Sequence, residues 1–201
     1  NYNCVIPMDT DTFKIIINGM DELRNYTSIP IVSKDIFNKK YINIKCENDK
    51  MKITLISVYP DLRSYGIRSI SACLKQEGHD VDLIFLLREF HEKYTEKTMN
   101  DLVKLTNESD LVGISLMSNF WDLAVQITQK LKDNYDFPIL WGGTHPTIRP
   151  EECLDYADMV AIGESEETLI ELSRKMQNKQ YYYDTTGMGF NDKGKIIVNK
   201  L

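Results

Sequence analysis

Several features that would place this 201-residue sequence in a common class are missing. No apolar run approaches the roughly 20 residues that cross a bilayer, and there is no signal-peptide pattern, so we expect a soluble cytoplasmic protein without membrane contact. Lysine and arginine number 24 against 30 acidic residues, and no basic block offsets the net charge of −6. Because an acidic surface repels phosphate backbones, we expect no nucleic-acid partner.

Cysteine is also scarce. Cys4, Cys46, Cys73 and Cys153 are scattered without C-x-x-C spacing, so local spacing supports neither a zinc site nor an iron–sulfur cluster. We interpret them as buried thiols rather than disulfides. We therefore predict no catalytic residue and no protein-ligated metal in this chain.

Regular periodicity is present from Met51 onward. Apolar runs typical of buried strands alternate with helical patterns, and 42% of all residues are apolar, enough to fill a core. This order predicts an α/β fold with a doubly wound, five-stranded parallel sheet of Rossmann-like type. The strands are expected at 53–58, 81–87, 111–117, 138–141 and 159–162.

The two ends of the chain differ from this pattern. Residues 1–50 have short apolar runs among many polar residues, and we interpret them as an N-terminal extension of unknown role. The α/β domain is predicted to span 51–180. In 181–201 we predict a β-hairpin, with Tyr181–Tyr183 and Ile196–Val198 on its two sides and a turn near Asp192–Gly194.

Ligands of open parallel sheets bind at the carboxyl ends of the strands, so the loops there contain the candidate binding residues. Glycines at these ends let a ligand approach the backbone where a Cβ would block it. The first of these loops has no G-x-G-x-x-G, which argues against a dinucleotide site. The candidates for cofactor binding are Tyr59, Asp61, Arg63, Tyr65, Gly66, Ser115, Met117, Ser118, Asn119, Gly142, Gly143, His145, Gly163 and Glu164.

The run from Gly142 to Glu152, GGTHPTIRPEE, followed by Ala157-Asp158 and by Gly163 to Leu169, resembles the cobalamin (B12)-binding domain of B12-dependent radical SAM enzymes. The resemblance covers about Met51 to Leu201, and the combined motif is far more specific than a lone glycine pair. Ser165 stands where the family often has glycine.

The sequence is also similar to corrinoid carriers, which use D-x-H-x-x-G, then S-x-L, then G-G. Here Asp61 to Gly66 reads D-x-R-x-x-G, Ser115 to Met117 matches S-x-L except at the methionine, and Gly142-Gly143 completes the set. The resemblance implies that Arg63 stands where carriers place the histidine below cobalt. A protonated guanidinium has no lone pair to donate to a metal. Cobalamin held base-off, without a histidine ligand, is therefore expected.

The resemblance implies the cobalamin-binding part of a radical SAM enzyme, of methyltransferase type. Its partner would be a radical SAM barrel, in cis or in trans, that holds S-adenosylmethionine and a 4Fe-4S cluster, because the C-x-x-x-C-x-x-C motif is absent here. One alternative is a stand-alone corrinoid carrier. Another is a flavodoxin-like signalling module without cofactor, although such regulators need a phosphorylatable aspartate where Ser115 to Met117 stand.

Overall fold

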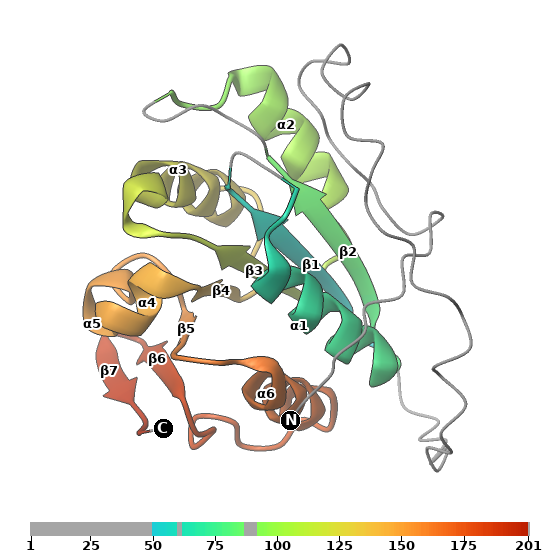
Figure 1. Ribbon diagram of the computed structural model, residues 1–201, viewed down its shortest axis with the longest axis vertical. Coiled ribbons are helices and arrows are strands. Elements are labelled where there is room, and N and C mark those ends of the chain that lie inside the picture. The colour runs from blue at the N-terminus through green and yellow to red at the C-terminus, as the bar shows by residue number, and fades with distance from the viewer. Residues whose placement is uncertain (1–49, 60–61, 87–91, 201) are drawn as a thin grey trace.

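A computed structural model describes residues 50–59, 62–86 and 92–200 of the chain (Figure 1). The expected N-terminal extension therefore lies outside the described residues, apart from Lys50. The same is true of Asp61 and of Leu87, the last residue of the predicted second strand.

One seven-stranded sheet organises the molecule, in the order β2-β1-β3-β4-β5-β6-β7. The first five strands run parallel, while β6 pairs antiparallel with β5 and β7 antiparallel with β6. The parallel five-stranded sheet and the C-terminal hairpin predicted from the sequence are both confirmed. The strands are β1 Lys52–Ser57, β2 Asp80–Phe85, β3 Leu111–Ser115, β4 Ile139–Gly142, β5 Met159–Ala161, β6 Met188–Asp192 and β7 Lys195–Val198.

Helices cover both faces of this sheet (Figure 1). One face packs against α1 (Tyr65–Gln76) and α6 (Glu166–Gln177), through Ile67, Leu74, Leu169 and Leu172. The opposite face packs against α2, α3 and α5. These remaining elements are α2 Glu96–Leu105, the 3-10 turn η4 Ser118–Phe120, α3 Trp121–Lys132, α4 Thr144–Ile148 and α5 Pro150–Cys153.

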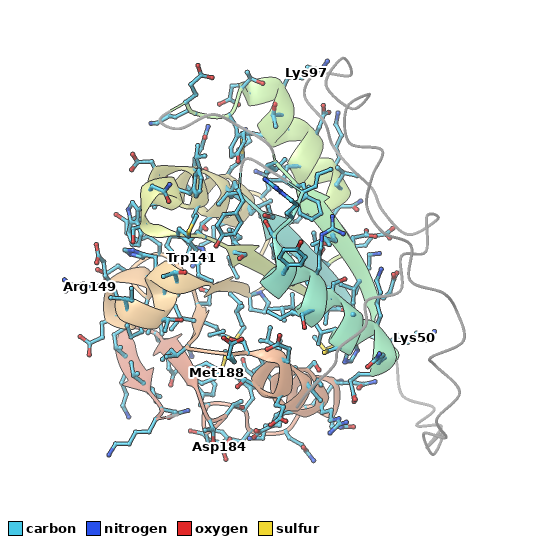
Figure 2. All side chains as sticks on the ribbon, viewed as in Figure 1. Lys50, Lys97, Trp141, Arg149, Asp184 and Met188 are labelled. Carbon is cyan, nitrogen blue, oxygen red and sulfur yellow. The ribbon has the colours of Figure 1, made fainter. Side chains whose placement is uncertain are left out.

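Alternation along each strand produces the two faces. In β1, Ile53 and Leu55 join the core under α1 and α6, whereas Ile56 belongs to the core under α2 and α3. Both cores exclude water, which explains the near-continuous apolar runs that predicted these strands. Figure 2 places Trp141 near α3 and the α4–α5 pair, and its indole Nε1 donates to Thr128 Oγ1 over 2.9 Å.

The predicted hairpin needs one correction. Its turn lies where expected, because Asp192 pairs with Lys195 and the intervening Lys193 and Gly194 both have positive φ, as a two-residue hairpin turn requires. Its first strand, however, is Met188–Asp192 and not Tyr181–Tyr183. The tyrosines precede the hairpin, and two of them pack on Phe190, with ring centroids 5.9 and 5.1 Å away.

Of the two cysteines that the structure describes, Cys153 is a buried thiol, as expected, whereas Cys73 is only partly buried. Burial raises the pKa of Cys153 to about 12, with Glu152 adding to the effect, so this thiol stays protonated and unreactive. Cys4 and Cys46 lie outside the described residues. Across 50–59, 62–86 and 92–200, no helix is long and apolar enough to cross a membrane.

Candidate functional site

The strand order reverses direction at β1 and β3. The chain runs from β1 outward to β2 and then returns across β1 to β3, which leaves the carboxyl ends of these two strands side by side. In open α/β sheets this position leaves a crevice between the diverging loops. The loops that follow β1, β3 and β4 all begin at this edge.

Small residues line the sheet at this edge, on the face under α1 and α6. Ser115 pairs with Gly142, and a Cβ built on Gly142 would lie 3.9 Å from the Cβ of Ala161. One row deeper, Gly113 pairs with Leu55 on one side and Leu140 on the other. The outer row of the floor therefore carries small side chains, whereas at Gly113 the side chain of Leu55 covers the glycine, since a Cβ there would lie 2.8 Å from Leu55 Cδ2.

The resulting space, named here the inner groove, has a volume of about 340 Å³ and lies between the sheet, α1 and α6. That volume falls at the lower end of the range for small-molecule sites. It is lined by Leu55, Gly66, Ile67, Ile70, Gly113, Ile114, Ser115, Leu140, Gly142, Gly143, Thr144, Thr147, Ala161, Gly163, Glu164, Ser165, Glu166 and Leu169.

A second space of about 480 Å³, named here the outer cavity, opens beside it at the carboxyl edge of the sheet. The two spaces share Gly66, Ser115 and Gly143 among their lining residues, so they adjoin. The outer cavity is lined by Tyr59, Arg63, Ser64, Tyr65, Gly66, Ile67, Ser115, Met117, Phe120, Gly143 and Thr144. A ligand with one part at the edge of the sheet and another between the sheet and its covering helices fits this arrangement.

Glycine is needed at Gly143 for two separate reasons. Its φ of +107° is rarely adopted by other residues, and a Cβ there would lie 2.6 Å from the carbonyl oxygen of Leu116. Gly66 differs, because a Cβ at that position would meet nothing within 4 Å. Gly66 lies one turn before Ile70 on the same side of α1, so the missing side chain leaves open space at the junction of the two cavities.

Tyr59 lies in the loop after β1 and forms part of the wall of the outer cavity. Its ring lies edge-on against Phe120, with centroids 5.7 Å apart. Burial raises the pKa of Tyr59, and a hydrogen bond with Ser115 partly opposes this effect. The hydroxyl therefore remains protonated near neutral pH and can donate a hydrogen bond at the floor of the outer cavity.

Thr147 links the segments after β4 and β5 through two hydrogen bonds. Its hydroxyl donates to the carbonyl of Gly143 over 2.9 Å and accepts from the backbone N–H of Gly163 over 3.0 Å. The mouth of the groove beside this contact carries Glu164 and Glu166.

His145 lies in the short helix α4. Its Nδ1 is 2.8 Å from Ser118 Oγ, and its ring lies against Trp121. Within the described residues its buried Nε2 has no hydrogen-bond partner, and the nearest carboxylate, that of Glu152, is 4.0 Å away. The hydrogen bond between His145 and Ser118 joins α4 to the loop after β3 and positions that loop at the edge of the outer cavity.

The structure brings most of the predicted site residues together. Those that line one or both cavities are Tyr59, Arg63, Tyr65, Gly66, Ser115, Met117, Gly142, Gly143, Gly163 and Glu164. Ser118, Asn119 and His145 line neither cavity and stand beside the outer one, while Asp61 is outside the described residues. Their cofactor contacts remain predictions.

Gly113, Ala161 and Thr147 are among the lining residues that were missed. Gly113 and Ala161 lie inside apolar runs, where a small residue carries no motif, and Thr147 acts through its hydrogen bonds. The period-2 alternation could have found the first two, because Gly113 and Ser115 share one face of β3. No sequence signal distinguishes Thr147 from any other helical threonine.

A family model described as the B12 binding domain matches residues 51–173. This match covers more than half of the chain and includes every predicted site residue. The chain belongs to the B12-binding domain family. No curated protein sequence matches it.

Solved structures agree on the fold of this B12-binding domain. TsrM from Kitasatospora setae, a radical S-adenosylmethionine methyltransferase solved with cobalamin and a [4Fe-4S] cluster, is similar with a TM-score of 0.61 and 17% identity over 76% of this chain. The cobalamin-dependent S-adenosylmethionine radical enzyme OxsB, with aqua-cobalamin bound, gives a TM-score of 0.61 and 20% identity over 76%. The B12-binding domain spans only 29% of the TsrM chain and 22% of the OxsB chain.

The geometry of this B12-binding domain fits the cofactor that its family name implies. Gly66 and Gly142 carry no side chain that would obstruct a ligand, and the two cavities adjoin, which leaves one space at the edge of the sheet and one between the sheet and α1 and α6 for a ligand of two parts. Among the described residues, no group of His, Cys, Asp and Glu could hold a metal ion, so cobalt would have to come with the cofactor.

Proposed function

We propose that this chain is the cobalamin-binding part of a radical SAM enzyme, of methyltransferase type, and that it holds cobalamin base-off without a histidine ligand. The observation that carries the proposal is the inner groove, which begins at the outer cavity and runs between α1 and α6 over Ser115, Gly142 and Gly113. When bound, cobalamin supplies a cobalt centre that can carry and transfer a methyl group.

The residues take separate roles in this proposal. The nucleotide tail enters the inner groove beside Gly66 and Gly142, where no side chain obstructs it. Ser115 and Tyr59 offer hydroxyl groups at the junction of the two cavities. Tyr65 and Met117, 73% and 37% exposed, present apolar surface at the rim for the corrin ring.

The absence of a histidine ligand rests on Arg63, which lines the outer cavity. Of the two histidines within the described residues, His145 is bonded to Ser118, and His79 stands before β2, at the opposite edge of the sheet. Held without a strong nitrogen donor, the cofactor would supply a cobalt centre that is more easily reduced and more readily gives up a methyl group.

The proposal extends to a radical SAM barrel with S-adenosylmethionine and a 4Fe-4S cluster, in cis or in trans. The likeness to TsrM and OxsB supports it, since this domain forms a minor part of each of those longer chains. The stand-alone carrier is the weaker alternative because Arg63 replaces the histidine that carriers use.

The test is a titration of the purified chain with hydroxocobalamin and methylcobalamin, followed by desalting and absorbance spectroscopy. We expect stoichiometric retention and a base-off spectrum. Arg63→His should convert this to the spectrum of histidine-ligated cobalamin, while Arg63→Gln should leave it base-off. A wild-type spectrum with a nitrogen ligand on cobalt would overturn the histidine-free assignment.

A further inference from the structure

The inner groove changes in polarity along its length. Its polar lining residues stand at or beyond the carboxyl ends of β3, β4 and β5: Ser115, Thr144, Thr147, Glu164, Ser165 and Glu166. The deeper row consists of Leu55, Gly113 and Leu140 on the floor, with Ile70 and Leu169 on the helices. A ligand that fills the groove therefore has a polar part at the mouth and an apolar part inside.

Several hydrogen-bonding groups of the groove are already used, in the deep row at Gly113 and at the mouth in Thr147 and Ser165. Gly113 lies in a strand paired on both sides, so its backbone N–H and C=O belong to the ladders with β1 and β4. The hydroxyl of Thr147 bonds Gly143 and Gly163, and the hydroxyl of Ser165 donates to the carbonyl of Gly163 over 3.1 Å. A polar group pushed inward would lose its water and find no replacement partner.

We propose that the inner groove selects corrinoids whose nucleotide ends in an apolar bicyclic base, such as dimethylbenzimidazole, over corrinoids that end in a purine. The inference rests on the proposed function, because it assumes that the nucleotide tail occupies this groove. Adenine has an exocyclic amine and additional ring nitrogens, which need partners that Leu55, Leu140 and Leu169 do not supply. Burial of a dimethylated ring on these leucines is favourable instead.

Equilibrium dialysis of the full chain against three corrinoids tests the selection: cobalamin, the cobamide with adenine as its lower base, and cobinamide, which has no base. We expect the Kd for cobalamin to be at least about tenfold lower than for the adenine cobamide, since one unpaired buried polar group accounts for that factor. Cobinamide should also bind more weakly than cobalamin.

The three ligands distinguish a failure of the proposed selection from a failure of the proposed function. Equal or tighter binding of the adenine cobamide overturns the selection, as does equal binding of all three corrinoids, and either result leaves the proposed function standing. If none of the three is retained, the proposed function itself fails.

A conservative variant probes the groove directly. Ile70→Thr places one hydroxyl in the deeper, apolar row and should reduce the preference for cobalamin over the adenine cobamide roughly 2- to 10-fold. Ile170→Thr is the matched control, because Ile170 is half-buried in α6 and lines neither cavity. An unchanged preference in Ile70→Thr, with both variants folded, would contradict the assignment of the base to this groove.

Discussion

At the scale of single residues, the glycines of the site differ in whether the fold itself requires glycine at that position. Gly143 is required by the backbone, through its φ of +107° and the nearby carbonyl of Leu116. Gly66 and Gly142 have no such constraint, and a Cβ at either position fits the fold. Loss of cobalamin from a Gly143 variant would therefore not distinguish a blocked groove from a strained loop.

This difference predicts the stability of two variants. Gly143→Ala should lower the free energy of unfolding by about 1–3 kcal/mol, the usual effect of a strained residue with positive φ. Gly142→Ala is the control and should stay within about 1 kcal/mol of wild type. Urea denaturation measures both, and equal losses in the two variants would refute the distinction.

His79 predicts an effect of pH on stability. It is 5% exposed, neither ring nitrogen has a hydrogen-bond partner among the described residues, and burial lowers its pKa despite an opposing effect of Glu77. Because the unfolded chain binds the proton first, stability should fall as pH drops through the unfolded pKa of about 6.5. The fall should end once pH is below the lowered folded pKa.

The measurement compares wild type with His79→Leu between pH 7.5 and 5. The variant should lose less stability over this interval than wild type does, because its residue 79 does not titrate. Parallel stability curves for the two proteins would show that His79 is not the group responsible.

At the scale of elements, apolar runs predicted the five parallel strands because both faces of the sheet are covered. The tyrosines at 181–183 misled the hairpin prediction, since β-propensity reflects packing as much as backbone preference. Tyr182 and Tyr183 obtain that packing from Phe190 without entering the sheet. Short α4 was also missed, because five residues with a proline give little periodicity.

The hairpin is attached to the domain by Asn191. Its Oδ1 accepts from the backbone N–H of Gly194 and its Nδ2 donates to the carbonyl of Leu154, both over 2.8 Å. Asn191→Ala should therefore lower the free energy of unfolding by about 1–3 kcal/mol in thermal or urea denaturation. Lys195→Ala, on the exposed start of β7, is the control, and a similar effect in both would argue against this attachment.

At the scale of the whole molecule, the sheet does not end at the fifth parallel strand. Met188 and Phe190 of β6 are fully buried in the core under α1 and α6, and Figure 2 places Met188 beside α6. A chain ending at residue 180 loses both side chains and leaves β5 as an open edge. The hairpin therefore supports the fold that contains the groove, whatever follows it.

We expect this truncated chain to lose cooperative unfolding. Removal of two large core side chains destabilises by an amount comparable with the total stability of a domain. Thermal unfolding followed by circular dichroism, together with gel filtration, should show a broad transition or aggregation. A sharp transition at the wild-type temperature would contradict this role of β6.

The location of the site was predictable from the sheet topology and from the positions of glycines in the loops. Carboxyl-end loops, the Gly142-Gly143 pair and Ser115 are visible in the sequence, and they do gather at one edge. The floor of the groove was not predictable, because it depends on how Ser115, Gly142 and Ala161 align across β3, β4 and β5. Register of that kind becomes visible only when the sheet is assembled.

The most direct test of the cobalamin assignment is a hydroxocobalamin titration of three proteins: wild type, Gly66→Leu and Gln76→Leu. Gly66 adjoins both cavities and has open space around it, whereas Gln76 ends the same helix, is exposed and lines neither cavity. We predict 1:1 binding by wild type and Gln76→Leu and at least a tenfold weaker Kd for Gly66→Leu, with all three equally stable. Equal binding by all three, or none by wild type, would contradict the placement of cobalamin in this site.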